Sequence, residues 1–319
     1  ENVTDAHGPT YPTHAAVDNG FAAAQKLGVQ LVRSTTLGVS VGSPRSLEPT
    51  LGHFNAKAFT AIDYAVAEAR KYGIHLMIPL TDEWHYYHGG KHTFTNWLGH
   101  KDIPGQNCVT SAKQRAREDY FYHGRRAIAA FHRYVAHLLN HVNPLTGLRL
   151  GSDPTIAIWE TGNELWDAPP SWTQRTAAFI KTLAPRALVA DGSAASGKDI
   201  TQTGVHDRSV DVVDGHFYPT DSAKAVHDAR YAAAQGKAYM VGEYPLTGTG
   251  VRSWLTTLSD HHAIAGGLAW SLFPDVDGVP EQHDDGYTFH VPGADPSEAR
   301  EDADQRSYAH TVDIWDRDR

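Results

Sequence analysis

The feature that most constrains the fold is a repeated alternation between short apolar runs and longer runs with helical spacing. The alternation recurs roughly every 30 to 40 residues, which is typical of parallel strands connected by covering helices. Seven runs have the composition of strands: Val29–Thr35, His75–Leu80, Thr155–Trp159, Ala187–Asp191, Val210–Phe217, Ala238–Val241 and Gly267–Leu272. Because parallel strands need a crossover to return, the pattern predicts an α/β fold with one parallel sheet.

Seven strands are one fewer than a closed (β/α)8 TIM barrel requires. Helical spacing begins as early as Ala15–Leu27. The strand ahead of that helix would therefore lie before Glu1, which we favour, or be formed irregularly by Glu1–Thr10. A barrel without it would expose two sheet edges, so we expect lower stability or a partner that covers the gap. No linker or low-complexity tract interrupts the chain, which predicts a single (β/α)8 domain over residues 1–319.

Composition excludes several classes of function. The hydrophobic share of 41% supports a large core, and the net charge of −9 without a Lys/Arg-rich run argues against nucleic-acid binding. No apolar run approaches the roughly 20 residues of a membrane-spanning helix. The 20 histidines are scattered, and the single cysteine, Cys108, cannot form an internal disulfide or a cysteine-based metal site. We therefore expect no metal and no cofactor, while the oligomeric state stays open.

Polar and aromatic residues lie within or just beyond the ends of the predicted strands, which is where the catalytic side chains of a barrel lie. These residues are Arg33, Asn163, Glu164, His216, Tyr218, Glu243 and Trp270. A lone glutamate at a strand end is more often an ion-pair or capping residue. If the missing strand is counted as the first, however, Glu164 and Glu243 would follow strands four and seven and lie on opposite sides of the mouth. Glycosidic bond cleavage needs such a pair of carboxyl groups, one protonated and one ionised.

Four motifs resemble glycoside hydrolase family 5, a family of retaining clan A barrels: WETGNELW (159–166), HFYP (216–219), GEY (242–244) and AWSLF (269–273). The resemblance covers nearly the whole chain. Within the family, LVRSTTLG (31–38) and the segment 121–147 are similar to the endo-β-1,4-mannanase-like branch. The resemblance implies retaining cleavage of β-1,4-mannan or manno-oligosaccharides by double displacement, without a cofactor.

The resemblance also implies individual roles. Glu164 would be the general acid/base and Glu243 the nucleophile. Arg33 and Tyr218 would contact the nucleophile, and His216 would orient the acid/base or a sugar hydroxyl. Asn163 and Trp270 would contact the sugar. Asn163 would hold the 2-hydroxyl of the sugar being cleaved, and Trp270 would form the floor under that sugar in subsite −1.

The segment after the second apolar run departs from the family pattern. Many members have a histidine at the end of the third barrel strand, where this chain has Trp84 followed by His85. We expect Trp84 to line the cleft within a long functional loop over residues 81–110, and Trp166 to be a further sugar platform. The acidic stretch 275–285 could bind a divalent ion, although a solvated loop is the commoner outcome.

Three alternatives remain open. An exo-acting β-mannosidase or a β-glucanase would use the same mechanism on another substrate, and the loops on the glycone side would separate them. A barrel that binds carbohydrate without cleaving it is a more remote alternative. Secretion is expected only because polymeric substrates of this class are extracellular.

Overall fold

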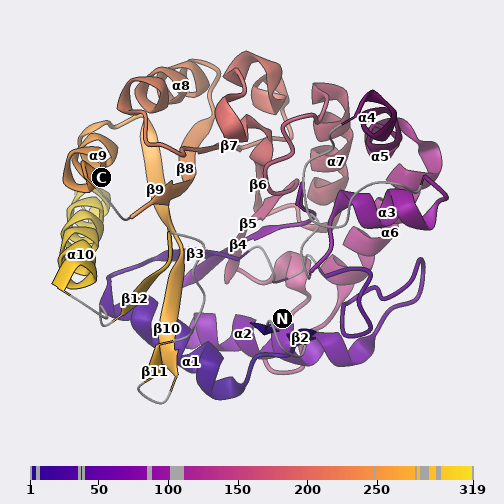
Figure 1. The fold of residues 1–319 in the computed structure, drawn as a ribbon, viewed down its shortest axis with the longest axis horizontal. Coiled ribbons are helices and arrows are strands. Elements are labelled where there is room, and N and C mark those ends of the chain that lie inside the picture. Colours follow the sequence, from indigo (N-terminus) through magenta and orange to yellow (C-terminus); the bar gives the residue numbers. More distant parts are fainter. Residues whose placement is uncertain are drawn as a thin grey trace.

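The computed structural model describes residues 2–4, 8–34, 37, 40–84, 88–100, 111–246, 249–276, 279–280, 287–291 and 296–317, and Figure 1 shows its strands encircled by helices. Seven parallel strands form one sheet in sequence order. They are β3 (Leu31–Arg33), β4 (His75–Pro79), β5 (Ile156–Glu160), β6 (Leu188–Asp191), β7 (Val212–His216), β8 (Ala238–Pro245) and β9 (Ile264–Trp270). The predicted barrel of seven strands is confirmed.

Seven longer helices lie outside these strands: α1 (His14–Lys26), α2 (Phe59–Lys71), α6 (Arg125–Asn140), α7 (Pro170–Leu183), α8 (Ser222–Ala234), α9 (Val251–Asp260) and α10 (Pro296–Arg317). Side-chain caps begin some of them. Thr13 accepts a hydrogen bond from the backbone of Ala16, and Asp221 accepts one from Lys224, which satisfies N–H groups that the helix leaves unpaired. Among the helices described, none is long and apolar enough to cross a bilayer.

Short helices fill the connections between these elements. Three of them lie between β4 and α6: α3 (Lys91–Trp97), α4 (Ala112–Glu118) and α5 (Tyr120–His123). The predicted loop over residues 81–110 therefore contains a helix, α3. The 3-10 helices are η1 (Ala56–Ala58), η2 (Leu150–Ser152), η3 (Gly192–Gly197), η4 (Ile200–Gln202) and η5 (Gly204–His206).

Two small sheets lie outside the barrel sheet. β1 (Asn2–Thr4) and β2 (Gly8–Thr10) pair antiparallel with each other, so these described residues do not form the irregular barrel strand that was one expectation for Glu1–Thr10. β10 (Leu272–Val276) pairs with β11 (Val279–Pro280) and β12 (Phe289–Val291) and packs beside α1. Within the described residues, β3 and β9 are thus the two edges of the barrel sheet.

Alternation along the strands builds the barrel interior in layers. Five buried side chains form an apolar cluster of their own, separate from the larger core under the helices: Met77, Ile158, Ala190, Val212 and Met240. Side chains two positions apart point to the same face of a sheet. The next interior positions after Ile158 and Val212 are therefore Glu160 and Asp214, and a polar layer rests directly on the apolar one.

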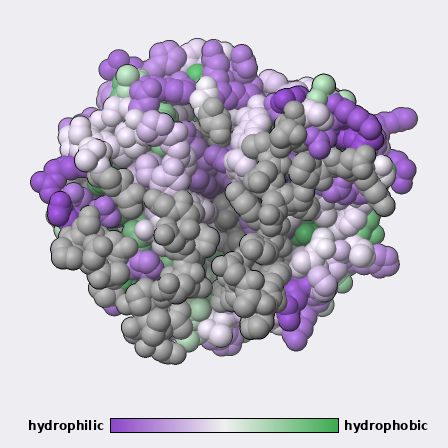
Figure 2. Space-filling view, viewed as in Figure 1, coloured by the Kyte–Doolittle hydropathy of each residue, from purple (hydrophilic) through white to green (hydrophobic). Residues whose placement is uncertain are grey.

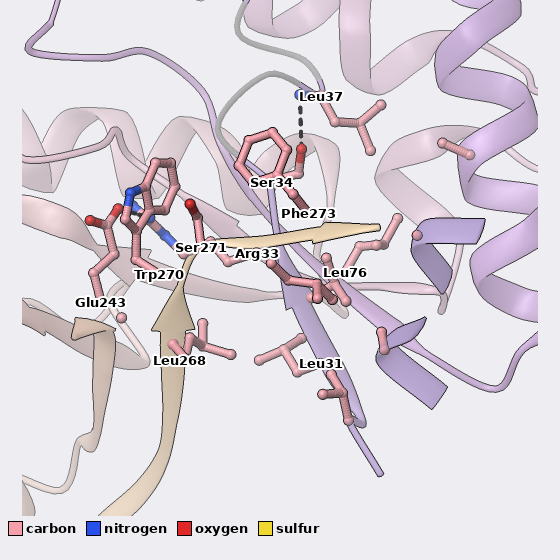
Figure 3. Close-up of a pocket in the computed structure, with 18 of the residues that line it drawn as sticks. Leu31, Arg33, Ser34, Leu37, Leu76, Glu243, Leu268, Trp270, Ser271 and Phe273 are labelled. Carbon is pink, nitrogen blue, oxygen red and sulfur yellow. Dashed lines mark hydrogen bonds and ion pairs between the residues drawn. The ribbon is translucent and has the colours of Figure 1, made fainter. Parts of the chain in front are cut away.

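We expect a leucine-to-alanine substitution at the sheet edge to destabilise the fold less than the same substitution in the core under the helices. Leu139 of α6 is fully buried, whereas Leu31 of β3 is only partly buried at the edge (Figure 3). Leu139→Ala should lower the free energy of unfolding by about 2 to 5 kcal/mol. Leu31→Ala should lower it by about 1 kcal/mol, the central value for point substitutions, because this side chain is only partly buried. Urea unfolding of both variants measures the difference, and equal losses would contradict it.

Candidate active site

Arg33, the last residue of β3, lies at the centre of the polar layer. Its side chain is only 4% exposed. The guanidinium binds Glu160 through two hydrogen bonds, from Nε at 2.7 Å and from Nη2 at 3.0 Å. Nη1 donates to Glu243 at 2.7 Å, and Nη2 also donates to Asn163 Oδ1 at 2.7 Å. One side chain therefore ties together β3, the end of β5 and β8.

Glu243 lies near the end of β8. A shift in register between β7 and β8 sets it opposite His216. Besides the contact with Arg33, its Oε2 accepts a hydrogen bond from the Tyr218 hydroxyl at 3.1 Å. Burial raises the pKa of Glu243, and the positive charges of His216 and Arg33 oppose that rise. Both residues expected beside this carboxylate are thus in contact with it.

Glu164 lies just beyond β5 in a backbone conformation that is unusual for a residue with a side chain. Its φ is 53°, in the left-handed region. Its carboxylate accepts hydrogen bonds from Trp84 Nε1 at 2.5 Å and from His216 Nδ1 at 3.0 Å. Burial by itself would raise the pKa of Glu164, but His216 and Trp84 bind the charged form and lower the pKa below its ordinary value.

His216 lies between three carboxylates. Nδ1 is 3.0 Å from Glu164 Oε1 and 3.5 Å from Glu243 Oε2, and Nε2 is 3.4 Å from Asp214 Oδ2. Burial alone would lower the pKa of His216. The negative charges of Glu243 and Asp214 overcome that effect and raise it well above the ordinary value. The surrounding carboxylates therefore favour the protonated form of the ring.

Two further carboxylates, Glu160 and Asp214, are fully buried beneath these residues, and sequence reasoning assigned neither a place in the site. Burial raises the pKa of Glu160 to about 7, although Arg33 opposes the shift. Glycines make room for both groups, since a Cβ at Gly192 would overlap Glu160 and one at Gly242 would overlap Asp214. The signal in the sequence was their spacing, two residues beyond an interior apolar side chain.

Asp82 orients the residues around Glu164. Its Oδ1 accepts hydrogen bonds from Asn163 Nδ2 at 3.1 Å and from the Trp84 backbone at 2.9 Å, and its Oδ2 lies 2.9 Å from His88 Nε2. The amide of Asn163 is therefore held at both ends, by Asp82 and by Arg33. Trp84 contacts Glu164 directly. The indole of Trp166 packs edge-on against the indole of Trp84, with the ring centroids 5.4 Å apart.

Two groups of His and Glu side chains have the spacing of metal ligands. In Glu83, His92 and Glu118, the ammonium of the buried Lys91 already pairs with both carboxylates. In Glu164, His216 and Glu243, the carboxylates accept hydrogen bonds from Arg33, Tyr218 and Trp84. Lys91 and Arg33 supply a positive charge at one group each, and the other donors occupy carboxylate oxygens that a metal ion would need. Both groups are therefore hydrogen-bonded, ion-paired networks in this structure.

A cavity of about 1140 Å³ opens onto these residues and continues between β3 and β9. Trp84, Tyr218, Glu164, Glu243 and Trp270 contribute to its wall, and Figure 3 shows Trp270 beside Glu243. The face of the molecule seen in Figure 2 is hollowed near its middle. His85, Cys108 and most of the acidic stretch, residues 277–278 and 281–286, lie outside the described residues.

Comparison with known proteins places this geometry in a family. The model described as "GH family 5 beta-mannosidase-like" matches residues 23–245, which is more than half of the chain. The chain belongs to glycoside hydrolase family 5. The resemblance carried by the four sequence motifs is thereby confirmed at the level of the family.

Similar proteins include two from rice. Mannan endo-1,4-beta-mannosidase 4 is 32% identical over 56% of this chain and 37% of its own length. Putative mannan endo-1,4-beta-mannosidase 5 is 25% identical over 88% of this chain and 66% of its own length. This chain thus spans between about a third and two thirds of the relatives it matches.

Solved structures share the fold at lower identity. The endo-1,4-beta-D-mannanase of Thermotoga petrophila has a TM-score of 0.76 at 24% identity and covers 94% of this chain and 96% of its own. The family 5 mannosidase of Rhizomucor miehei has a TM-score of 0.75 at 17% identity and covers 93% and 87%. Both comparisons confirm the barrel architecture.

Removing the guanidinium from this family 5 site should destabilise the fold. Arg33→Met leaves Glu160 buried without its cation, and breaking such a pair costs about 3 to 5 kcal/mol. The matched control is Arg252→Met, which removes an exposed ion pair with Asp304 and should lower the stability far less, because solvent screens such a pair. Chemical denaturation compares the two, and an Arg33 variant as stable as the control would contradict the role of Arg33 in this layer.

Proposed function

We propose that this protein is a retaining β-glycoside hydrolase that cleaves β-1,4-mannan or manno-oligosaccharides by double displacement. The observation that carries the proposal is the separation of Glu164 and Glu243. One oxygen of each carboxylate lies within 4.8 Å of the other. Carboxyl groups in retaining enzymes are about 5 to 5.5 Å apart, whereas inverting enzymes keep about 6.5 to 9.5 Å to admit a water molecule.

The contacts of each carboxylate support one role. Arg33 and Tyr218 fix both oxygens of Glu243, which suits an ionised nucleophile that attacks the anomeric carbon. Glu164 faces the same cavity and is coupled to His216, which suits a group that gives and takes a proton. Glu164 would protonate the leaving oxygen in the first step and activate water in the second.

Further residues supply contacts to the sugar. With Oδ1 held by Arg33 and one N–H directed to Asp82, we assign the second N–H of Asn163 to the sugar 2-hydroxyl. Such a contact can strengthen as positive charge develops on the ring. Trp270 would form the floor of the subsite, since an indole offers an apolar face to the C–H face of a sugar. Trp84 and Trp166 would extend this surface.

The mannan preference rests on the family match and on the names of the relatives. The description "beta-mannosidase-like" also keeps the exo-acting alternative in place. We further propose that residues 1–319 act as a single catalytic domain, because the buried side chains under the helices form one contiguous cluster. An extracellular location follows from the proposed polymeric substrate alone.

A panel of β-mannan, manno-oligosaccharides, β-glucan, xylan and aryl β-glycosides tests the proposal. We expect the wild type to release short oligosaccharides from mannan, as separated by chromatography. Mannose as the sole product would establish exo action. Cleavage of β-glucan alone would contradict the mannan assignment. Binding without cleavage of any member of the panel would favour the non-catalytic alternative.

Isosteric variants test the two roles. Glu164→Gln should lower kcat/KM on mannan by about 10² to 10⁴, the usual contribution of general acid–base catalysis. Glu243→Gln should abolish turnover on every glycoside, because an amide cannot form the covalent intermediate. Circular dichroism of both variants controls for folding. A folded Glu243→Gln variant with wild-type activity would contradict the proposed nucleophile.

A further inference from the structure

Asp214 is a buried carboxylate for which the proposed reaction has no use. It lies on β7 two residues before His216 and is fully buried. Neither of its oxygens accepts a hydrogen bond from a described residue. The cationic groups near it are His216 Nε2 at 3.4 Å and Arg33 Nε at 3.7 Å. A buried carboxylate is costly unless a positive charge compensates it, so this position has to be balanced by one or both of them.

Arg33 already serves other carboxylates. Its nitrogens are hydrogen-bonded to Glu160, Glu243 and Asn163, and Asp214 lies beyond hydrogen-bond distance from it. His216 is the nearer partner, and Gly242 leaves the space in which the Asp214 carboxylate lies against the β8 backbone. Asp214 is therefore placed to keep a proton on His216.

Among the described residues, the charged neighbours of His216 come from four strands and their ends. Glu160 and Glu164 come from β5 and its end, Asp214 from β7 itself, Glu243 from β8, and Arg33 from β3; Tyr218 adds a hydroxyl beside Glu243. Four carboxylates surround the ring against one permanent cation. The electrostatic potential of these groups therefore favours the protonated form of His216, the imidazolium.

The acid/base role of Glu164 requires a source for the proton that Glu164 delivers, and His216 can supply it. Glu164 has its pKa lowered, and so it is ionised in the resting site at neutral pH. The leaving oxygen nevertheless needs a proton. The nearest one is on His216 Nδ1, 3.0 Å from Glu164 Oε1.

We propose that Asp214, His216 and Glu164 form a proton relay, in which the His216 imidazolium stores the proton that Glu164 delivers and Asp214 is the positioning residue that holds the imidazolium. This inference rests on the proposed glycosidase function. It assigns Asp214 to the reaction and makes His216 the resting site of the proton.

The relay balances in charge and atoms. The resting site has a positive His216 and negative Glu164 and Glu243. As Glu243 bonds to the anomeric carbon, the electron pair of the broken C–O bond stays on the leaving oxygen. That oxygen takes a proton from Glu164, which takes one from His216 Nδ1. Glu243 is then a neutral ester, so the loss of its charge 3.5 Å from Nδ1 releases the proton at that moment. Attack of water on the ester reverses every proton transfer.

The first test compares kcat/KM against pH for the wild type and Asp214→Asn. Without the charge of Asp214, His216 loses its proton at lower pH. The alkaline limb should therefore move down by about 1 to 3 pH units, as expected for removing one close charge. The variant should lose at least roughly tenfold on an aryl mannoside with a poor leaving group. It should change little on a dinitrophenyl mannoside, whose leaving group needs no proton.

The matched control is Asp191→Asn. Asp191 is equally buried at the end of β6 but accepts hydrogen bonds from the backbone of Ser193 and Gly204. It should leave the position of the alkaline limb and the leaving-group dependence unchanged. If Asp214→Asn lowers activity equally on both mannosides at an unchanged pH profile, Asp214 is merely structural and the relay is wrong.

A second measurement needs no Asp214 variant. In wild-type protein labelled with ¹⁵N-histidine, with His216 assigned through His216→Gln, NMR should show an imidazolium at pH 7. Trapping Glu243 with a 2-fluoro mannosyl fluoride should convert that signal to a neutral ring. A neutral His216 in the free enzyme, or an imidazolium that survives trapping, overturns the relay. A wild type that cleaves no glycoside contradicts the proposed function instead, and the free-enzyme spectrum still decides the charge on His216.

Discussion

The polar interior of this barrel depends on the buried guanidinium of Arg33. A single side chain from the edge strand β3 reaches Glu160, Asn163 and Glu243, and so bridges residues that are far apart in the sequence. Arginine suits this position because its planar fork can bind one carboxylate through two bonds and still donate to others. Without it, several carboxylates would be buried together with little to balance their charge.

The charge surplus links stability to function. In the part of the chain that the structure describes, Arg33 and His216 are the cationic groups paired with Glu160, Asp214, Glu164 and Glu243, so the described cluster holds more carboxyl groups than cations. Burying such groups is unfavourable by itself. The same surplus keeps a proton on His216, beside the group that has to deliver one. The unfavourable free energy of burying these carboxylates and the supply of a proton thus have the same electrostatic origin.

Much of this arrangement follows from the sequence. The strand and helix periodicity predicts the seven-stranded barrel, and the rule that sites lie at strand ends locates Glu164 and Glu243. The same rule locates Arg33, Asn163, His216 and Tyr218, and the family resemblance adds a role for each of them. Glu160 and Asp214 could have been found as well, because each lies two residues beyond an interior side chain on its own strand.

Other features could not be read from the sequence, for physical reasons. The contact of Asp82 with Asn163 joins two loops after neighbouring strands, and loop geometry has no periodic signal. The pairing of β10 with β12 spans segments without regular spacing. The pairing of β1 with β2 in a separate sheet rules out, for the described residues, the less favoured of the two alternatives for Glu1–Thr10, and such short segments carry too few residues for a periodic signal.

The central claim is that Glu164 and Glu243 are close enough for double displacement. The most direct test is the anomeric configuration of the first product released from a β-linked manno-oligosaccharide, followed by NMR before mutarotation. Two successive displacements at the anomeric carbon should release the β-anomer. Initial release of the α-anomer would mean a single displacement by water and would contradict the account.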